Sequence, residues 1–80
     1  MRAPQRDLRG IYKLLEQIVD AEPRPIALTD DEIAERINKR MRLDPPLSAN
    51  RVWYYRKLLA IPANGKRRKQ YIAERNNGKA

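Results

Sequence analysis

The highest local density of charged side chains in the sequence is a run of four adjacent cations near the C-terminal end of the chain. Ammonium and guanidinium groups at this density bind nucleic-acid phosphates or the carboxylates of an acidic protein surface. A tail that is only solvated has the same composition, so the residue types leave both interpretations open. The candidate contacts are Lys66, Arg67, Arg68 and Lys69.

A helix predicted over residues 49–60 carries the second group of candidate residues. At 100° per residue, the core side of this helix is formed by Val52, Tyr55, Arg56 and Leu59. Tyr54 points the opposite way, and exposed aromatic residues dominate the binding energy of protein interfaces. Trp53 lies at the edge, where it either joins an interface or packs over the first helix or the proline loop. The candidate partner-binding residues are Asn50, Trp53, Tyr54 and Lys57, with Arg51 and Arg56 as further contacts to phosphate or a partner.

An acidic cluster over residues 30–35 is the one group that resembles a metal or acid–base site. Helix capping explains Asp30, Asp31 and Glu32, because carboxylates in a first turn oppose the positive end of the helix dipole. Glu35 lies four residues before Lys39 and pairs with it on a helix. The sequence has no His and no Cys, so it lacks imidazole and thiolate ligands and a Cys/His nucleophile pair. We therefore expect no enzyme, with no catalytic, metal or cofactor site.

The positive charge is concentrated at the two ends of a chain too short for more than one domain. The net charge is +8 over 80 residues, and most of it lies in residues 1–6, which include Arg2 and Arg6, and in residues 62–80. We expect a flexible basic arm over 1–6, a folded domain over 7–62 and a basic, largely disordered tail over 63–80. No apolar run approaches the ~18 residues of a membrane span, and no signal peptide is recognisable. This favours a cytoplasmic protein without membrane contact.

Apolar spacing predicts two helices in the first half of the chain. Apolar residues recur at three- and four-residue steps up to position 19, which predicts a helix over roughly 7–21 with the aspartate at position 7 as its N-cap. Pro23 ends this pattern because its ring nitrogen cannot donate a hydrogen bond. The second helix begins at a capping box formed by Thr29 and Glu32 and ends near Met41.

The third predicted helix, over 49–60, completes an all-α three-helix bundle with flexible basic termini. Ser48 offers its N-cap, and the prolines at 45 and 46 forbid helix before it. The second and third helices suggest a helix-turn-helix. The connection over 42–47 is longer than the usual turn, so we expect a variant of that motif.

Two segments in this order resemble a known family. Residues 28–37 (LTDDEIAERI) and 51–62 (RVWYYRKLLAIP) are similar to the C-terminal promoter-binding domain of sigma-54, whose signature box is the second segment. The likeness covers most of residues 11–69, including the basic run. It implies a three-helix domain that presents its last helix as the recognition helix.

The resemblance also shows which base-reading residues differ. In the family, paired arginines near the start of the recognition helix read guanines, since a guanidinium donates two bonds to one guanine. The corresponding positions here are Ala49 and Asn50, and a family lysine is replaced by Tyr54. Each lost contact removes about 1–3 kcal/mol of base discrimination. The family's buried-side positions are kept as Val52, Tyr55, Leu59 and Ile61, and its arginine as Arg56.

The chain has none of the upstream regions of a sigma factor, so the resemblance implies a basic domain that acts alone. Such a domain is similar to the small transcription regulators that lytic bacteriophages make to bind host RNA polymerase. We therefore expect a monomer in the host bacterial cytoplasm that binds the polymerase at its β′ subunit. The implied effects are inhibition of sigma-dependent initiation and antitermination.

Two other functions are compatible with the same residues. A sequence-specific DNA-binding helix-turn-helix protein would read adenine with Asn50 and hold phosphates with Arg51 and Lys57. The basic termini would then supply salt-sensitive affinity. In the third alternative the tail binds RNA and the bundle is inert.

Overall fold

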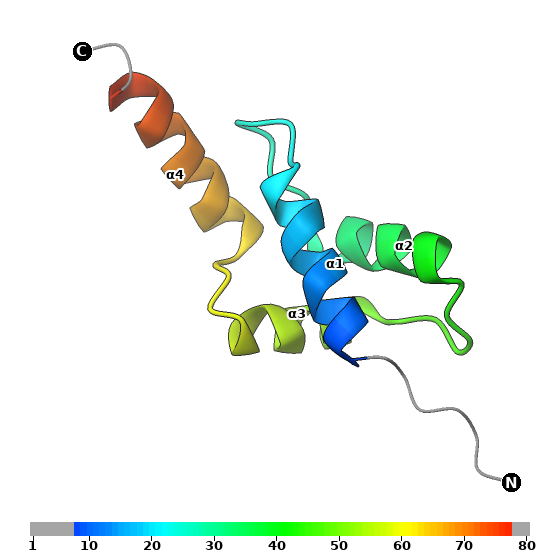
Figure 1. The fold of residues 1–80 in the computed structure, drawn as a ribbon. Helices are drawn as coiled ribbons and strands as arrows, with labels where there is room; N and C mark the ends of the chain where they lie inside the picture. The colour runs from blue at the N-terminus through cyan, green and yellow to red at the C-terminus, as the bar shows by residue number, and fades with distance from the viewer. Residues whose placement is uncertain (1–7, 78–80) are drawn as a thin grey trace, which may run out of the picture.

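The computed structural model describes residues 8–77, and over that range the chain is entirely helical in its regular structure (Figure 1). The predicted all-α class is confirmed. The basic arm over 1–6, the predicted N-cap at position 7 and residues 78–80 lie outside the described residues. The helices are α1 (Leu8–Asp20), α2 (Asp30–Met41), α3 (Ala49–Leu58) and α4 (Asn64–Asn77).

The first three helices begin and end within two residues of their predicted bounds. The capping box of α2 is present, because the Glu32 amide donates to Thr29 Oγ1 at 3.2 Å and the Thr29 amide donates to Glu32 Oε1 at 3.0 Å. The amide and hydroxyl of Thr29 lower the pKa of the Glu32 carboxyl. Ser48 caps α3 by accepting from the Arg51 amide at 3.2 Å.

The loop between α2 and α3 is tied back to α2 by one asparagine. Asn38 Nδ2 donates to the Leu47 carbonyl at 2.8 Å, and the Leu47 amide donates to Asn38 Oδ1 at 2.6 Å. Leu47 is itself buried in the core. These contacts fix where α3 starts, and α3 packs more closely against α2 than any other pair of helices among the described residues.

The core lies between α1, α2 and α3 and extends into the two loops that join them. Tyr12 of α1 meets Tyr55 of α3 edge to face, with ring centroids 5.2 Å apart. The most deeply buried side chains are the aliphatic ones that the helical periodicity predicts. They are Ile11, Leu15, Ile33, Ile37 and Val52.

A fourth helix corrects the prediction of a largely disordered tail over 63–80. Residues 64–77 form α4, so the bundle of three predicted helices is followed by a fourth. Pro62 precedes this helix, and Gly65 lies in its first turn without ending it. Low apolar content predicted disorder, but the face that α4 turns to the rest of the chain is held by Arg67 and Tyr71, which are both buried. Hydrogen bonds and an ion pair hold α4 in place of the apolar stripe that the sequence lacks here, and the lack of that stripe is why a disordered tail was expected.

Candidate partner-binding surface

The outer face of α3, which we define as Asn50, Trp53, Tyr54 and Lys57, is exposed along its length. These positions recur at three- and four-residue steps, so they share one side of the helix. Trp53 is 43% exposed and Tyr54 is 49% exposed, which is unusual for two adjacent large aromatic residues. Their roles in binding stay a prediction.

A cation fixes one side of the tryptophan. Lys57 Nζ lies 4.3 Å from the centroid of the Trp53 ring, in the geometry of a cation–π contact. Leu58, which is 57% exposed, continues the apolar surface towards the end of α3. The ring centroid of Tyr54 lies 6.1 Å from that of the buried Tyr55, and this contact links the outer face of α3 to the core.

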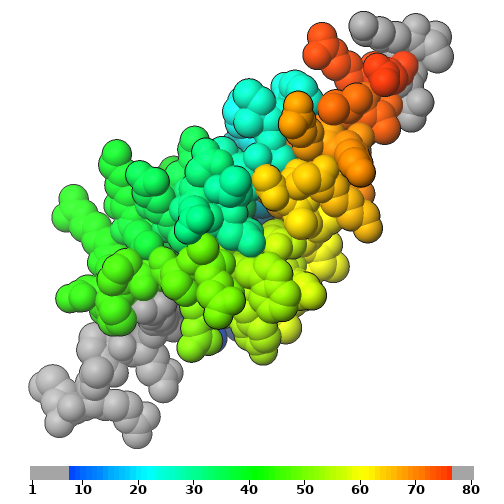
Figure 2. All heavy atoms as spheres, turned by 180° about the vertical axis from the view of Figure 1, so that it is seen from behind, coloured from blue at the N-terminus to red at the C-terminus, as the bar shows by residue number. Residues whose placement is uncertain are grey.

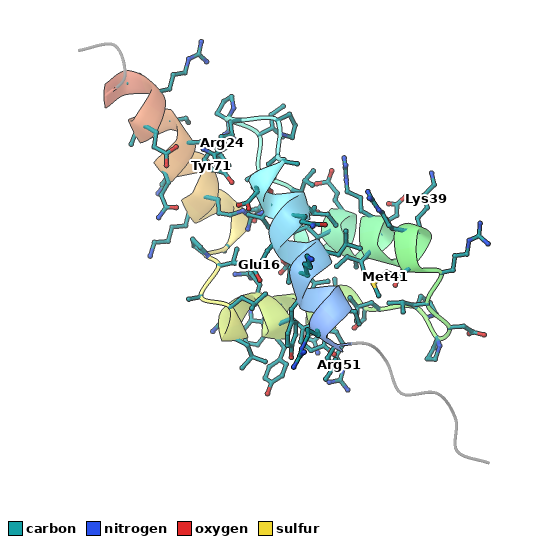
Figure 3. All side chains as sticks on the ribbon, viewed as in Figure 1. Glu16, Arg24, Lys39, Met41, Arg51 and Tyr71 are labelled. Carbon is teal, nitrogen blue, oxygen red and sulfur yellow. The ribbon has the colours of Figure 1, made fainter. Side chains whose placement is uncertain are left out.

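Arg51 and Arg56, both predicted contacts, have opposite environments. Arg51 is exposed in the first turn of α3, beneath the N-terminal end of α1 in the view of Figure 3. Arg56 is only 4% exposed, and its role as a phosphate or partner contact is wrong. Its Nε and Nη2 donate to the two carboxylate oxygens of Asp30 at 3.0 and 3.2 Å, and its Nη1 donates to the Ile61 carbonyl at 3.0 Å. This clamp joins α3 to the start of α2.

Arg67 is a second buried clamp, which corrects its prediction as a free contact of the basic run. It is 2% exposed and forms two bonds to Glu22, from Nε at 3.0 Å and from Nη2 at 2.7 Å. Its remaining bonds go to the carbonyls of Leu28 and Pro62, each at 2.7 Å. The other members of the run are exposed on α4. They are Lys66, Arg68 and Lys69.

The carboxylate of Glu22 is the centre of this buried network. It accepts from the Leu28 amide at 2.7 Å and from the Tyr71 hydroxyl, in addition to Arg67. Burial by itself raises the pKa of Glu22, but these hydrogen bonds and the charge of Arg67 outweigh it and lower the pKa. The pKa of Tyr71 is raised by burial and by its bond to Glu22. Within the described residues, every buried side-chain nitrogen and oxygen has a hydrogen-bond partner.

A third contact at the edge of the network connects α4 to the loop that follows α1. The guanidinium of Arg24 lies 4.5 Å from the centroid of the Tyr71 ring and donates to Glu74 at 3.2 Å. Figure 3 shows Arg24 and Tyr71 side by side where this loop meets α4. In the space-filling view of Figure 2, the cyan atoms of the loop lie against the orange atoms of α4.

The sequence analysis did not predict this network, although the spacing of its residues on α4 is a signal for that half of it. Arg67, Tyr71 and Glu74 are spaced as neighbours on one helix face. Their partners Glu22 and Arg24 lie in the loop after α1, next to Pro23 and Pro25, and carry no pattern that marks them. The spacing predicts that α4 has an inward face, but not what that face contacts.

The two clamps change the charge that the surface presents. No acid lies between Asp44 and Glu74 in the sequence, whereas seven cations do. Arg56 and Arg67 are neutralised internally, which leaves five exposed cations without an acidic neighbour in the same segment. They are Arg51, Lys57, Lys66, Arg68 and Lys69.

The acidic cluster at the start of α2 has structural contacts. Asp30 pairs with Arg56, and Glu32 closes the capping box. Across residues 8–77, no group of three His, Cys, Asp or Glu side chains is arranged to hold a metal ion. None of the helices in that range combines the length and apolar character needed to cross a bilayer.

No protein-family model matches the sequence, and no curated protein or solved structure matches it either.

Proposed function

We propose that the protein is a phage-type transcription regulator that binds bacterial RNA polymerase through the outer face of α3, with the β′ subunit as its contact. The observation that carries this proposal is the pair of exposed aromatic rings, Trp53 and Tyr54, on a helix anchored to the core by Val52, Tyr55 and Arg56. A rigid helix with exposed aromatics on one side is typical of a protein-binding surface.

The sigma-54 resemblance supports the choice of partner. Its two segments, residues 28–37 and 51–62, cover most of α2 and of α3, and Asp30 of the first segment pairs with Arg56 of the second. Residues that carry the resemblance thus help to build the scaffold, while the positions that would read bases differ from those of the family. A scaffold of this kind without its base-reading arginines suits a protein that acts on the polymerase itself. The proposed effects are inhibition of sigma-dependent initiation and antitermination.

The second candidate function is sequence-specific DNA binding by a helix-turn-helix related to the sigma-54 promoter-binding domain. The observation that favours it is the set of five exposed cations with no acid between residues 44 and 74. Asn50 is exposed in the first turn of α3, and an asparagine side chain pairs with both edge groups of an adenine. The basic surface would supply affinity that falls steeply with salt.

Titration of the labelled protein with polymerase core, and separately with a mixed-sequence DNA duplex, discriminates between these functions. Each titration is done at low and at near-physiological salt. The proposal expects saturable binding to the core that persists at the higher salt and is weakened about tenfold or more by Trp53→Ala or Tyr54→Ala. Ile26→Ala, which removes an apolar side chain that is 60% exposed in the loop between α1 and α2, is the matched control. Salt-resistant DNA binding without affinity for the core would replace the proposal by the second function.

A further inference from the structure

A groove runs between the end of α3 and the beginning of α4, next to the outer face of α3. Trp53 and Lys57 of α3 line it on one side, and Lys66 and Gln70 of α4 line it on the other. Figure 1 shows the short linker that connects the two helices, and its residues 60–63 line the groove between these two sides. Because α4 forms one wall, the groove exists only when the network around Glu22 holds α4 in place.

The floor of the groove is apolar and offers few hydrogen-bond donors. It is formed by Ala60, Ile61, Pro62 and Ala63. Arg56 also lies there, but its Nε, Nη1 and Nη2 are engaged with Asp30 and the Ile61 carbonyl. The ring of Trp53 adds a large apolar surface at one end. A ligand in this groove therefore meets an apolar floor between charged rims.

The rims are positive, with Lys57 on one side and Lys66 on the other. No acid occurs in either helix before Glu74, so no side chain of α3 or of the first half of α4 neutralises them. This charge matches a segment that carries carboxylates on both sides of an apolar residue. A nucleic-acid strand fits less well, because its successive bases stack on several aromatic side chains and the lining of this groove offers only the ring of Trp53.

We propose that this groove binds an acidic, apolar-containing peptide segment of the protein partner. Carboxylates of the segment pair with Lys57 and Lys66, and an apolar side chain lies on the Trp53 ring and the floor. This inference rests on the proposed function, since it specifies how a protein partner of the α3 surface would be recognised. It adds α4 to the recognition surface, which the outer face of α3 alone does not include.

Trp53 makes the groove directly measurable, because it is the only tryptophan in the chain. Its emission is followed while the full-length protein is titrated with a peptide of about four Glu-Glu-Leu repeats. The same repeats with Gln in place of Glu, and an oligo(dT) strand of similar length, are titrated in parallel. The test variant is Lys66→Glu, which α4 tolerates because an acid in a first turn is favoured.

Arg68→Glu is the matched control for this variant. It makes the same change in net charge two residues further along α4, where the side chain projects to the opposite side of the helix. Arg68 is exposed and does not line the groove. Far-UV circular dichroism establishes that both variants keep α4.

The expected result is a saturable change of Trp53 emission with the acidic peptide at near-physiological salt, and a weaker response to the uncharged peptide. Lys66→Glu lowers the affinity about tenfold, the effect of one lost charge-assisted contact, and Arg68→Glu leaves it within about twofold. No response of Trp53, or an equal loss in both variants, would overturn the inference. Tighter binding of oligo(dT) that depends on Lys66 would assign the groove to nucleic acid instead.

The polymerase titration separates this inference from the proposed function. If the core binds and Tyr54→Ala weakens it while Lys66→Glu does not, the function stands and the groove is not used. If the acidic peptide binds in the groove but the core does not bind, the inference stands and the proposed partner is wrong.

Discussion

The carboxylate of Glu22 and the guanidinium of Arg67 form a buried, two-bond ion pair between residues that are 45 positions apart. Both side chains are almost completely removed from solvent. Removing two charges from water is costly, and a buried pair of this kind is stable only when its remaining hydrogen-bonding groups also find partners. Here the backbone of Leu28 and of Pro62 supplies those partners.

Replacing Arg67 by methionine tests the importance of this pair for α4. The variant leaves the Glu22 carboxylate buried without its cation, which costs about 3–5 kcal/mol. We expect α4 to lose its docked position, seen as reduced helical circular dichroism and as faster proteolysis between residues 63 and 77. Arg68→Met, a change of the neighbouring exposed arginine, should leave both measurements as in the unmodified protein. An Arg67→Met protein with unchanged stability towards urea would contradict this account.

The same network makes the stability of the fold depend on pH. The pKa of Glu22 is lowered in the fold, so its contribution is complete above the unfolded value near 4.5 and is lost as pH falls through the folded pKa. The pKa of Tyr71 is raised, so its contribution is present below 10 and is lost as pH rises through the folded pKa. Urea midpoints measured across the pH range should therefore fall at both ends.

Tyr71→Phe isolates the alkaline part of this prediction. The variant removes the group that titrates, so we expect a lower stability at neutral pH and a smaller decrease above pH 10. Tyr54→Phe, which alters an exposed phenol, is the control and should keep the full alkaline decrease. An equal loss of stability in both variants at each pH would show that the Tyr71 hydroxyl does not cause the alkaline decrease.

Ala60 lies in the left-handed region of the backbone, at the turn after α3, with φ 57°. This conformation costs a residue with a Cβ about 1–2 kcal/mol, and glycine avoids that cost. Glycine also has more conformational freedom in the unfolded chain, which offsets part of the gain. We expect Ala60→Gly to raise the free energy of unfolding by about 0.5–1 kcal/mol. Ala73→Gly, inside α4, should instead lower it by about 1 kcal/mol. Urea unfolding of the two variants in parallel measures the sign of the change in the free energy of unfolding for each.

Asn38 positions the start of α3 through its two bonds to Leu47. Asn38→Ala leaves a buried backbone amide and carbonyl without partners, at a cost of about 1–3 kcal/mol. We expect lower stability and weaker partner binding, because the first turn of α3 then loses its anchor. Lys39→Ala, at the adjacent exposed position of α2, should change neither quantity. Normal binding and stability in Asn38→Ala would show that the proline loop holds α3 without this contact.

Local patterns in the sequence predict most of the bundle. Prolines mark the loops, Thr29 and Glu32 carry the capping signature, and helical periodicity identifies the buried aliphatic residues. These features depend on residues close together in the chain, so they can be recognised without knowing the tertiary structure. The exposure of Tyr54 follows from the same periodicity, whereas the periodicity puts Trp53 at the edge of the helix and leaves its exposure open.

The attachment of α4 and the environments of two arginines are not predictable in this way. Arg67 belongs to a basic run. The composition of that run is the same whether the partner of Arg67 is solvent, a ligand or Glu22. Only the fold places a carboxylate from the first loop beside it. Arg56 was predicted on the core side of α3 and also as a surface contact, and its ion pair with Asp30 shows that only the first is correct.

The way in which α4 is held also affects the solubility of the chain. Because α4 is attached by directed polar bonds and carries few apolar residues, its detachment uncovers mainly groups that water solvates well. The aliphatic core between α1, α2 and α3 stays closed when that happens. Transient detachment of α4 therefore exposes little of the apolar surface that drives aggregation.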